Sequence, residues 1–187
     1  MGLMVTVLII AFPLIIGIVI FNSLVALRAQ ARNGWAQIDV QLKRRADLVP
    51  NLVESVKGAM SHERETLENV VRLRNQAVAL QKDGDTPERI QAEGALSTAL
   101  GRLFALMENY PDIKATQNIA ALQEELTSTE NRIGFARQHY NDVATSFNAR
   151  IEQIPANIVA SIAGMTGFPL WAIEDAADRA APRVALR

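Results

Sequence analysis

An uncharged segment near the N-terminus constrains the fold of this chain more than any other feature. The stretch LMVTVLIIAFPLIIGIVIF, from Leu3 to Phe21, holds no charged residue. At about 1.5 Å per helical residue it spans roughly 28 Å, close to the thickness of a bilayer core. The segment therefore predicts a transmembrane helix with a bend near Pro13. The predicted membrane anchor includes Leu3, Ile9, Phe12, Pro13, Ile16, Ile20 and Phe21.

The residues on either side of this segment predict its orientation. No Lys or Arg precedes it, whereas a cleaved signal peptide carries a basic leader, so we expect the helix to remain as an anchor. By the positive-inside rule, the basic residues that follow place the N-terminus outside and the bulk of the chain in the cytoplasm. The same residues also suit contact with anionic lipid headgroups. They are Arg28, Arg32, Lys43, Arg44 and Arg45.

Composition narrows the chemistry that the chain can carry. Its 187 residues are 49% hydrophobic, which is enough for one domain with a sizeable core. Because it has no cysteine, disulfides and thiolate chemistry are excluded. A net charge of -1 and two histidines disfavour nucleic-acid binding and a histidine metal cluster. We therefore expect no cofactor, no metal and no nucleic-acid partner.

Beyond the span, apolar residues recur mostly at intervals of three and four, which predicts that the anchor helix continues as a rod. Pro50 disfavours helix at Val49 and favours a new first turn, so a bend or a break is expected there. A second helix is then expected from Pro50 to Lys82.

The sequence KDGDTPER predicts a turn between two helices. Gly84 suits the end of one helix, Thr86 the cap of the next, and Pro87 its first position. The third helix is expected to run from Pro87 to about Asn109, because Pro111 disfavours its continuation.

A fourth helix carries the most regular apolar pattern, which is typical of a heptad seam. With no strand-like alternation, the fold class is predicted to be all-α, with the N-terminal transmembrane helix continuing into an antiparallel, four-helix type of bundle. The expected domains are a membrane anchor (1–27), a cytoplasmic bundle (28–155) and a C-terminal apolar segment and tail (156–187). The seam residues are Ile119, Leu122, Leu126, Thr129, Ile133, Ala136, Tyr140, Val143 and Phe147. The predicted bundle core includes Trp35, Ile38, Leu42, Leu126, Ile133 and Tyr140.

The stretch TENRIGFARQHYND combines charged and aromatic residues, as active sites do. With Ile133 and Tyr140 on the seam, its charges fall beside the seam, where they usually bridge neighbouring helices. The predicted rim ion pairs involve Arg45, Glu130, Arg132 and Arg137. A catalytic site remains the alternative, although the sequence lacks HExxH, Glu-x-x-His and phosphate-loop motifs.

Gly134 and Phe135 lie on the far side of the fourth helix and are the candidate subunit contact. There Gly134 would permit close approach and Phe135 would pack on another copy, with membrane tethering concentrating the chains. A wider buried face, or simple exposure on a monomer, is the alternative.

The segment after Pro155, ANIVASIAGMTGFPLWAI, is unusually apolar. Gly164, Gly167 and Pro169 break it into stretches too short for a second span. We expect it to lie at a surface, in the membrane interface or against a neighbour, and Trp171 suits either place.

Three stretches of this chain resemble the LemA family: NGWAQIDVQLKRRADLVPNLVESVKG, LGRLFALMENYPDIKATQNIAALQEELTSTENRIGFARQHYND and FNARIEQIPANIVA. The resemblance implies a bacterial single-pass membrane protein with a bundle of long helices and no established catalytic activity. Some relatives are associated with magnetosome membranes, which implies a role in organising or remodelling membrane. Two positions depart from the family pattern: Ala46 stands where histidine is common, and ASIAGMTGFP lacks the usual aromatic-glycine-aromatic pattern.

Two classes of function follow from these observations. The favoured one is a non-catalytic membrane-anchored scaffold that binds the bilayer, further copies of itself and other membrane proteins. It would lie in the bacterial inner membrane or an intracellular membrane derived from it. The alternative is a membrane-tethered enzyme or signalling component whose site is hidden in the bundle. An enzyme needs polar groups that converge on a cavity, whereas a scaffold needs a dry seam and an exposed contact surface.

Overall fold

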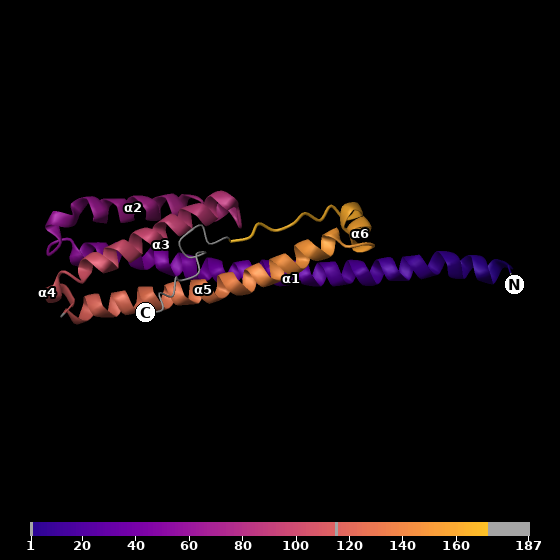
Figure 1. Cartoon of the computed structure of the whole chain (residues 1–187), viewed down its shortest axis with the longest axis horizontal. Helices are drawn as coiled ribbons and strands as arrows, with labels where there is room; N and C mark the ends of the chain where they lie inside the picture. Colours follow the sequence, from indigo (N-terminus) through magenta and orange to yellow (C-terminus); the bar gives the residue numbers. More distant parts are fainter. Residues whose placement is uncertain (1, 115, 172–187) are drawn as a thin grey trace, which may run out of the picture.

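The computed structural model describes residues 2–114 and 116–171, with the backbone alone for 3–8 and 114. The side chain of Leu3 and the C-terminal tail 172–187 lie outside the described residues. Every regular element in the described part is helical. One helix extends far beyond a body of shorter helices and carries the N-terminus at its free end (Figure 1).

This long helix is α1, Gly2–Val56, with 55 residues and both Pro13 and Pro50 inside it. Of the bend or break expected near Val49, the break is therefore wrong. Pro50 has no N–H to donate to the carbonyl of Ala46, one turn earlier. Arg74 of the next long helix donates its Nε to that carbonyl oxygen at 2.9 Å, which replaces the missing hydrogen bond. The helix continues because a side chain from another element satisfies it.

The expected second helix, Pro50–Lys82, is consequently divided. Its first residues complete α1, and a turn and η1 (Ser61–Glu63) lead into α2, Arg64–Ala79. The short η2, Gln81–Asp83, follows.

The predicted turn before the third helix is confirmed. Gly84 adopts a φ of 73°, which an L side chain rarely does, and Thr86 is the cap of α3, Pro87–Met107. The Thr86 hydroxyl accepts a hydrogen bond from the Arg89 backbone N–H at 3.4 Å. The single turn α4, Pro111–Lys114, then leads to α5, Gln117–Glu152.

The long helices run in alternating directions along the body (Figure 1). α1 packs chiefly on α5, and α2 packs chiefly on α3. A core cluster from all four helices joins the two pairs at the end of the body remote from the N-terminus. It includes Val49, Leu52, Val56, Leu67, Val70, Leu96, Leu100, Leu103 and Leu126.

The predicted seam of α5 lies on the side of the helix that packs in the core. Of the predicted core residues, Ile38, Leu42, Leu126, Ile133 and Tyr140 are buried and Trp35 is half-buried. The seam positions Leu122, Ala136 and Val143 are also only half-buried. A heptad pattern thus marks the inward side of α5 along nearly its whole length.

After α5 the chain turns back. The short helix α6, Ala156–Ile162, packs on α1 and on α5, and an extended segment then returns along the body (Figure 1). We call residues 163–171 the strap. Because α1 passes through the expected boundary at 27/28 without interruption, anchor and body share one helix.

Candidate functional site

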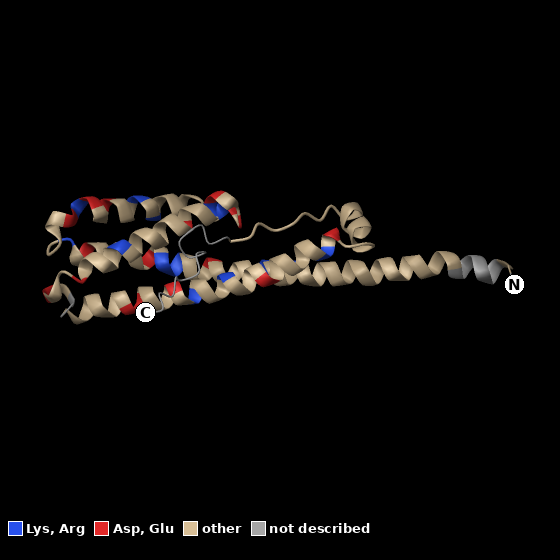
Figure 2. Ribbon diagram, viewed as in Figure 1, with Lys and Arg blue, Asp and Glu red and all other residues tan. Residues whose placement is uncertain are grey.

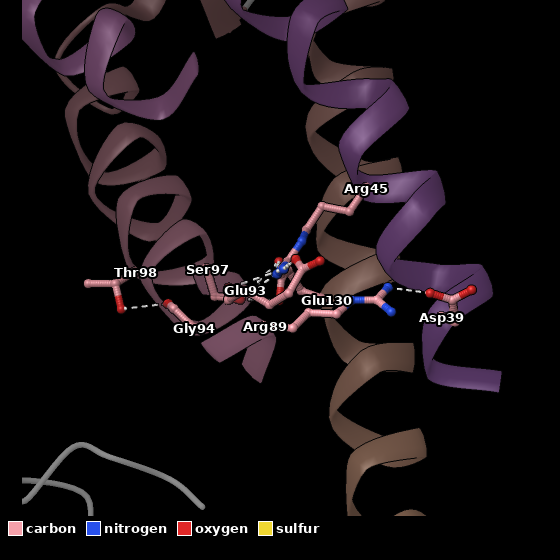
Figure 3. Close-up of polar contacts among 8 residues, drawn as sticks. All are labelled: Asp39, Arg45, Arg89, Glu93, Gly94, Ser97, Thr98 and Glu130. Atoms are coloured by element: carbon pink, nitrogen blue, oxygen red, sulfur yellow. Dashed lines mark hydrogen bonds and ion pairs between the residues drawn. The ribbon is translucent and has the colours of Figure 1, made fainter. Parts of the chain in front are cut away.

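A buried cluster of charges lies where α1, α3 and α5 meet (Figure 3). Arg45 of α1 is fully buried and donates Nη1 hydrogen bonds to Glu130 of α5 and to Ser97 of α3. Its Nη2 donates to the Glu93 carboxylate and, at 3.1 Å, to the Glu93 backbone oxygen. The Ser97 hydroxyl donates to Glu130 at 3.2 Å. One guanidinium therefore joins three helices.

The prediction that Arg45 lies at the rim is wrong. Arg45 follows Leu42 by three residues and precedes Val49 by four, so it lies on the inward side of α1. On α3, Glu93 precedes the buried Leu96 by three residues and the buried Leu100 by seven, and its side chain is also buried. Glu130, beside the seam, is partly exposed and does bridge two helices as predicted.

The electrostatics of this cluster are uneven because one cation faces two carboxylates. Removal from water disfavours the ionised form of a carboxyl group. Burial raises the pKa of Glu93 above its ordinary value, and the positive charge of Arg45 opposes that rise without cancelling it. A proton on Glu93 would leave a neutral Arg45–Glu130 pair.

A second buried arginine lies on α3 and binds the backbone of the turn that precedes this helix. Arg89 is buried and pairs through Nη2 with Asp39 of α1 (Figure 3). Its Nη1 donates to the backbone oxygens of Gln81 and Gly84 at 3.1 and 3.2 Å. Its guanidinium also lies 5.3 Å from the ring centre of Trp35, a cation-π contact. Sequence analysis missed Arg89 and Glu93, although both share the inward spacing of α3.

Aromatic side chains pack beside Arg89. Trp35 meets Tyr140 edge-on with ring centres 5.5 Å apart, and Trp171 of the strap lies 5.8 Å from Trp35. The Tyr140 hydroxyl donates to the Pro169 backbone oxygen at 2.8 Å. The strap therefore completes the core that α1 and α5 leave open.

Two asparagines of α5 hold the backbone of the strap. Asn148 donates its amide to the Phe168 oxygen at 2.9 Å and accepts from the Phe168 N–H at 2.8 Å. Asn141 binds Trp171 in the same way, at 3.0 and 2.9 Å. A Cβ on Gly167 would lie 2.9 Å from the Asn148 amide oxygen, so a side chain here would push the amide away from its bonds to Phe168.

The remaining predicted rim residues form no ion pair in the described part of the chain. Arg137 is half-buried and its guanidinium lies 4.9 Å from the ring centre of Trp171. Arg132 is exposed and lines a groove of about 450 Å³ between α1 and α5. The prediction of rim ion pairs for these two arginines is wrong. Arg132 faces the groove, and Arg137 feels the charge of Glu130 but packs on Trp171 of the strap, which lies far along the sequence.

The candidate subunit contact lies along this groove. Phe135 is 75% exposed, and Val40 of α1 beside it is 63% exposed. Gly134 is exposed too, and a Cβ there would meet nothing within 4 Å. The groove lies between two long helices. Its apolar lining is Val40, Phe135 and Ala136, and its polar lining is Gln37, Gln41, Arg132 and His139.

The predicted anchor residues differ in exposure along α1. Ile9, Phe12, Ile16 and Phe21 are exposed, as lipid-facing side chains of a single span are in the absence of a bilayer. Ile20 is instead covered by α6. The helix is long and apolar enough to cross a membrane by length and composition. Among residues 2–114 and 116–171, no three His, Asp or Glu side chains gather as metal ligands.

An exposed apolar helix that continues into an all-helical body defines a membrane-associated helical protein. Residues 34–186 match the LemA family model, and the chain belongs to the LemA family. It is 28% identical over 155 residues to Protein LemA of Metamycoplasma hominis, covering 80% of this chain and 70% of that protein.

Relatives from magnetic bacteria are also similar. Magnetosome protein MamQ 2 of Paramagnetospirillum magneticum is 25% identical over 167 residues, and Magnetosome protein MamQ of Magnetospirillum gryphiswaldense is 24% identical. Each alignment covers 77% of this chain and 61% of the relative. The chain thus spans about three fifths of the length of these magnetosome proteins.

Proposed function

We propose that this chain is a non-catalytic, single-pass membrane scaffold that self-assembles and presents its helical body to membrane or to partner proteins. The observation that carries the proposal is the continuity of α1, which joins the exposed apolar span to the body without a break. A helix of 55 residues transmits the orientation of the anchor to the body, whereas a flexible linker would not. The names of the magnetosome relatives support a role at a membrane.

The orientation follows from the charges beside the span. In the sequence, α1 carries no charge up to Leu27, and basic residues begin at Arg28. The coloured part of α1 that extends beyond the body is tan in Figure 2. This asymmetry supports a body in the cytoplasm and an N-terminus outside, in the bacterial inner membrane or a membrane derived from it.

Cysteine labelling tests the orientation, because the chain has no cysteine of its own. A membrane-impermeant thiol reagent should label Gly2→Cys in whole cells and Lys82→Cys only after permeabilisation. Both positions are exposed, so access depends on the side of the membrane alone. Labelling of Lys82→Cys in intact cells would reject the orientation.

Self-assembly is proposed through the groove that holds Phe135 and Val40. Both side chains are more than half exposed, and tethering in one plane raises the local concentration so that a modest contact suffices. Side-by-side contacts between identical upright bodies are heterologous, so they close into a ring or continue as an array.

Mass measurement in mild detergent tests this contact. The wild type should form a defined oligomer, Phe135→Ser should lose it with its helical signal intact, and Val71→Ser on α2 should retain it. Val71 is a matched control because it is also an exposed apolar residue on a helix surface. A monomeric wild type, or a Phe135→Ser variant of unchanged mass, would remove the proposed interface.

The Arg45 cluster is the one observation that favours a hidden enzymatic or signalling site, because its polar groups converge from three helices. Both Nη atoms of Arg45 are paired within the cluster, its Nε is buried without a partner, and the α1–α5 groove is lined by other residues. We therefore propose that the cluster fixes the three helices in register and performs no catalysis.

A further inference from the structure

We propose that α6 is a second membrane contact, with its isoleucine face in the interfacial layer of the bilayer that α1 crosses. The inference rests on the proposed membrane anchor and extends it: the chain would touch the bilayer at two points, one across it and one along its surface.

The position of α6 is the first step. Its Ala156 and Ala160, one turn apart, are buried against Ile20 and Leu24 of α1. Ile20 belongs to the uncharged span. Alanine side chains let two helices approach closely, so α6 lies directly against the last turns of the span (Figure 1).

The length of the uncharged part of α1 places this contact at the membrane surface. Residues 2–27 carry no charge, and as a helix they extend about 39 Å. The hydrocarbon core of a bilayer is about 30 Å thick, and its headgroup regions bring the total to about 40–45 Å. If residues 3–21 cross the core, then residues 22–27 lie in the headgroup region, and the α6 contact with Ile20 and Leu24 lies where core and headgroups meet.

The outer face of α6 has the composition of an interfacial surface. Ile154 and Ile162 are both 84% exposed, and Ile158 between them is also exposed. Ile158 and Ile162 are one turn apart on one face of α6, and Ile154 lies just before the helix, ahead of Pro155. From Gln153 to Trp171 the chain has no charged residue, and α6 is free of charge in Figure 2.

Continuity with the span identifies the bilayer as the occupant of this face. The alanine side of α6 packs beside Ile20, at the level where the proposed anchor leaves the bilayer, so a second copy on the outer side would have to displace the lipid there. Lipid headgroups and upper acyl chains accept an uncharged apolar helix lying in the plane of the surface.

Depth-dependent quenching in vesicles tests the inference on the full chain. Single cysteines at Ile158 and Ile162 would carry the fluorophore NBD in vesicles of phosphatidylcholine and phosphatidylglycerol. Lipids spin-labelled near the headgroup should quench both sites more strongly than lipids labelled deep in the acyl chain. Leu14→Cys in the span should show the opposite order. Thr127→Cys, exposed on α5 far from the span, should show little quenching by either lipid.

The outcomes separate this inference from the anchor on which it rests. If Leu14→Cys is quenched while both α6 sites behave like Thr127→Cys, the anchor stands and the α6 contact is rejected. Loss of quenching at Leu14→Cys as well rejects the anchor and the contact together. A blue-shifted α6 label without lipid quenching would mean that protein covers the face, which also rejects the contact.

Discussion

The Nε atom of Arg74 lies 2.9 Å from the carbonyl oxygen of Ala46, the acceptor that Pro50 leaves without a backbone donor. The two residues come from different helices, α2 and α1. Through this one hydrogen bond, α2 allows α1 to pass Pro50 and extend to Val56. The last turns of α1 then bury Leu52 and Val56 in the core.

Arg74→Ala should therefore destabilise the protein by about 1–3 kcal/mol, the usual cost of leaving a buried carbonyl unpaired. In a Pro50→Ala background the backbone N–H restored at this position can bond the same oxygen, so the same change should cost less. Chemical unfolding of the four proteins in a double-mutant cycle measures the difference. Equal costs in both backgrounds would show that Arg74 does not replace the missing donor.

Arg45→Met should destabilise the protein by about 3–5 kcal/mol, because it leaves the buried Glu93 carboxylate without its cation. The adjacent Arg44 offers a matched control, since its pair with Glu125 is solvent-exposed. Arg44→Met should cost about 0.2–1 kcal/mol. Thermal and urea unfolding followed by helical circular dichroism compare the two, and similar costs would contradict the buried role of Arg45.

The Glu93→Gln variant should change the pH dependence of stability. Burial raises the pKa of Glu93 in the folded protein above the unfolded value of about 4.3. Between these two values the folded state keeps a proton that the unfolded state has lost, so the free energy of unfolding falls as pH rises. Above the raised pKa the loss is complete, and below the unfolded value it is absent.

Urea unfolding of wild type and Glu93→Gln from about pH 4 to pH 8 measures this window. The difference in stability between the two proteins should grow in favour of the glutamine variant as pH rises. A difference that stays constant with pH would mean that the pKa of Glu93 is the same in both states.

Asn148→Ala should release the strap by removing two hydrogen bonds to Phe168, at about 1–3 kcal/mol. Gly167→Ala should act in the same direction because its Cβ would meet the Asn148 amide. Release would expose Trp171, so its fluorescence should shift to the red. Asn131→Ala, an exposed position on α5, is the control and should leave the emission unchanged.

The parts of this fold that depend on neighbouring residues could be predicted from the sequence. The seam of α5 and the start of α3 at Thr86 and Pro87 are examples, because periodicity and capping act within one helix. The continuation of α1 past Pro50 could not be predicted, because the donor that permits it comes from Arg74 in another helix.

The candidate site was harder to predict from the sequence, because its contacts also come from other helices. Arg45 and Glu93 occupy inward positions by spacing, yet a charge at such a position is usually placed at the rim. The ion-pair partners that offset the cost of burying Arg45 and Glu93 come together only where three helices meet. The position of Arg137 under Trp171 depends on the return of the strap, which no local pattern encodes.

Because α1 is continuous, the rotation of the anchor about the helix axis fixes the rotation of the body. Each residue of a helix turns it by about 100°, so one residue inserted between Leu24 and Arg28 would rotate the body by that angle around the anchor. Because α6 is attached to the body through α5 but rests on Ile20, the same insertion would carry it away from its place on α1. The number of residues between span and body thus sets the angle at which the body faces around its own anchor.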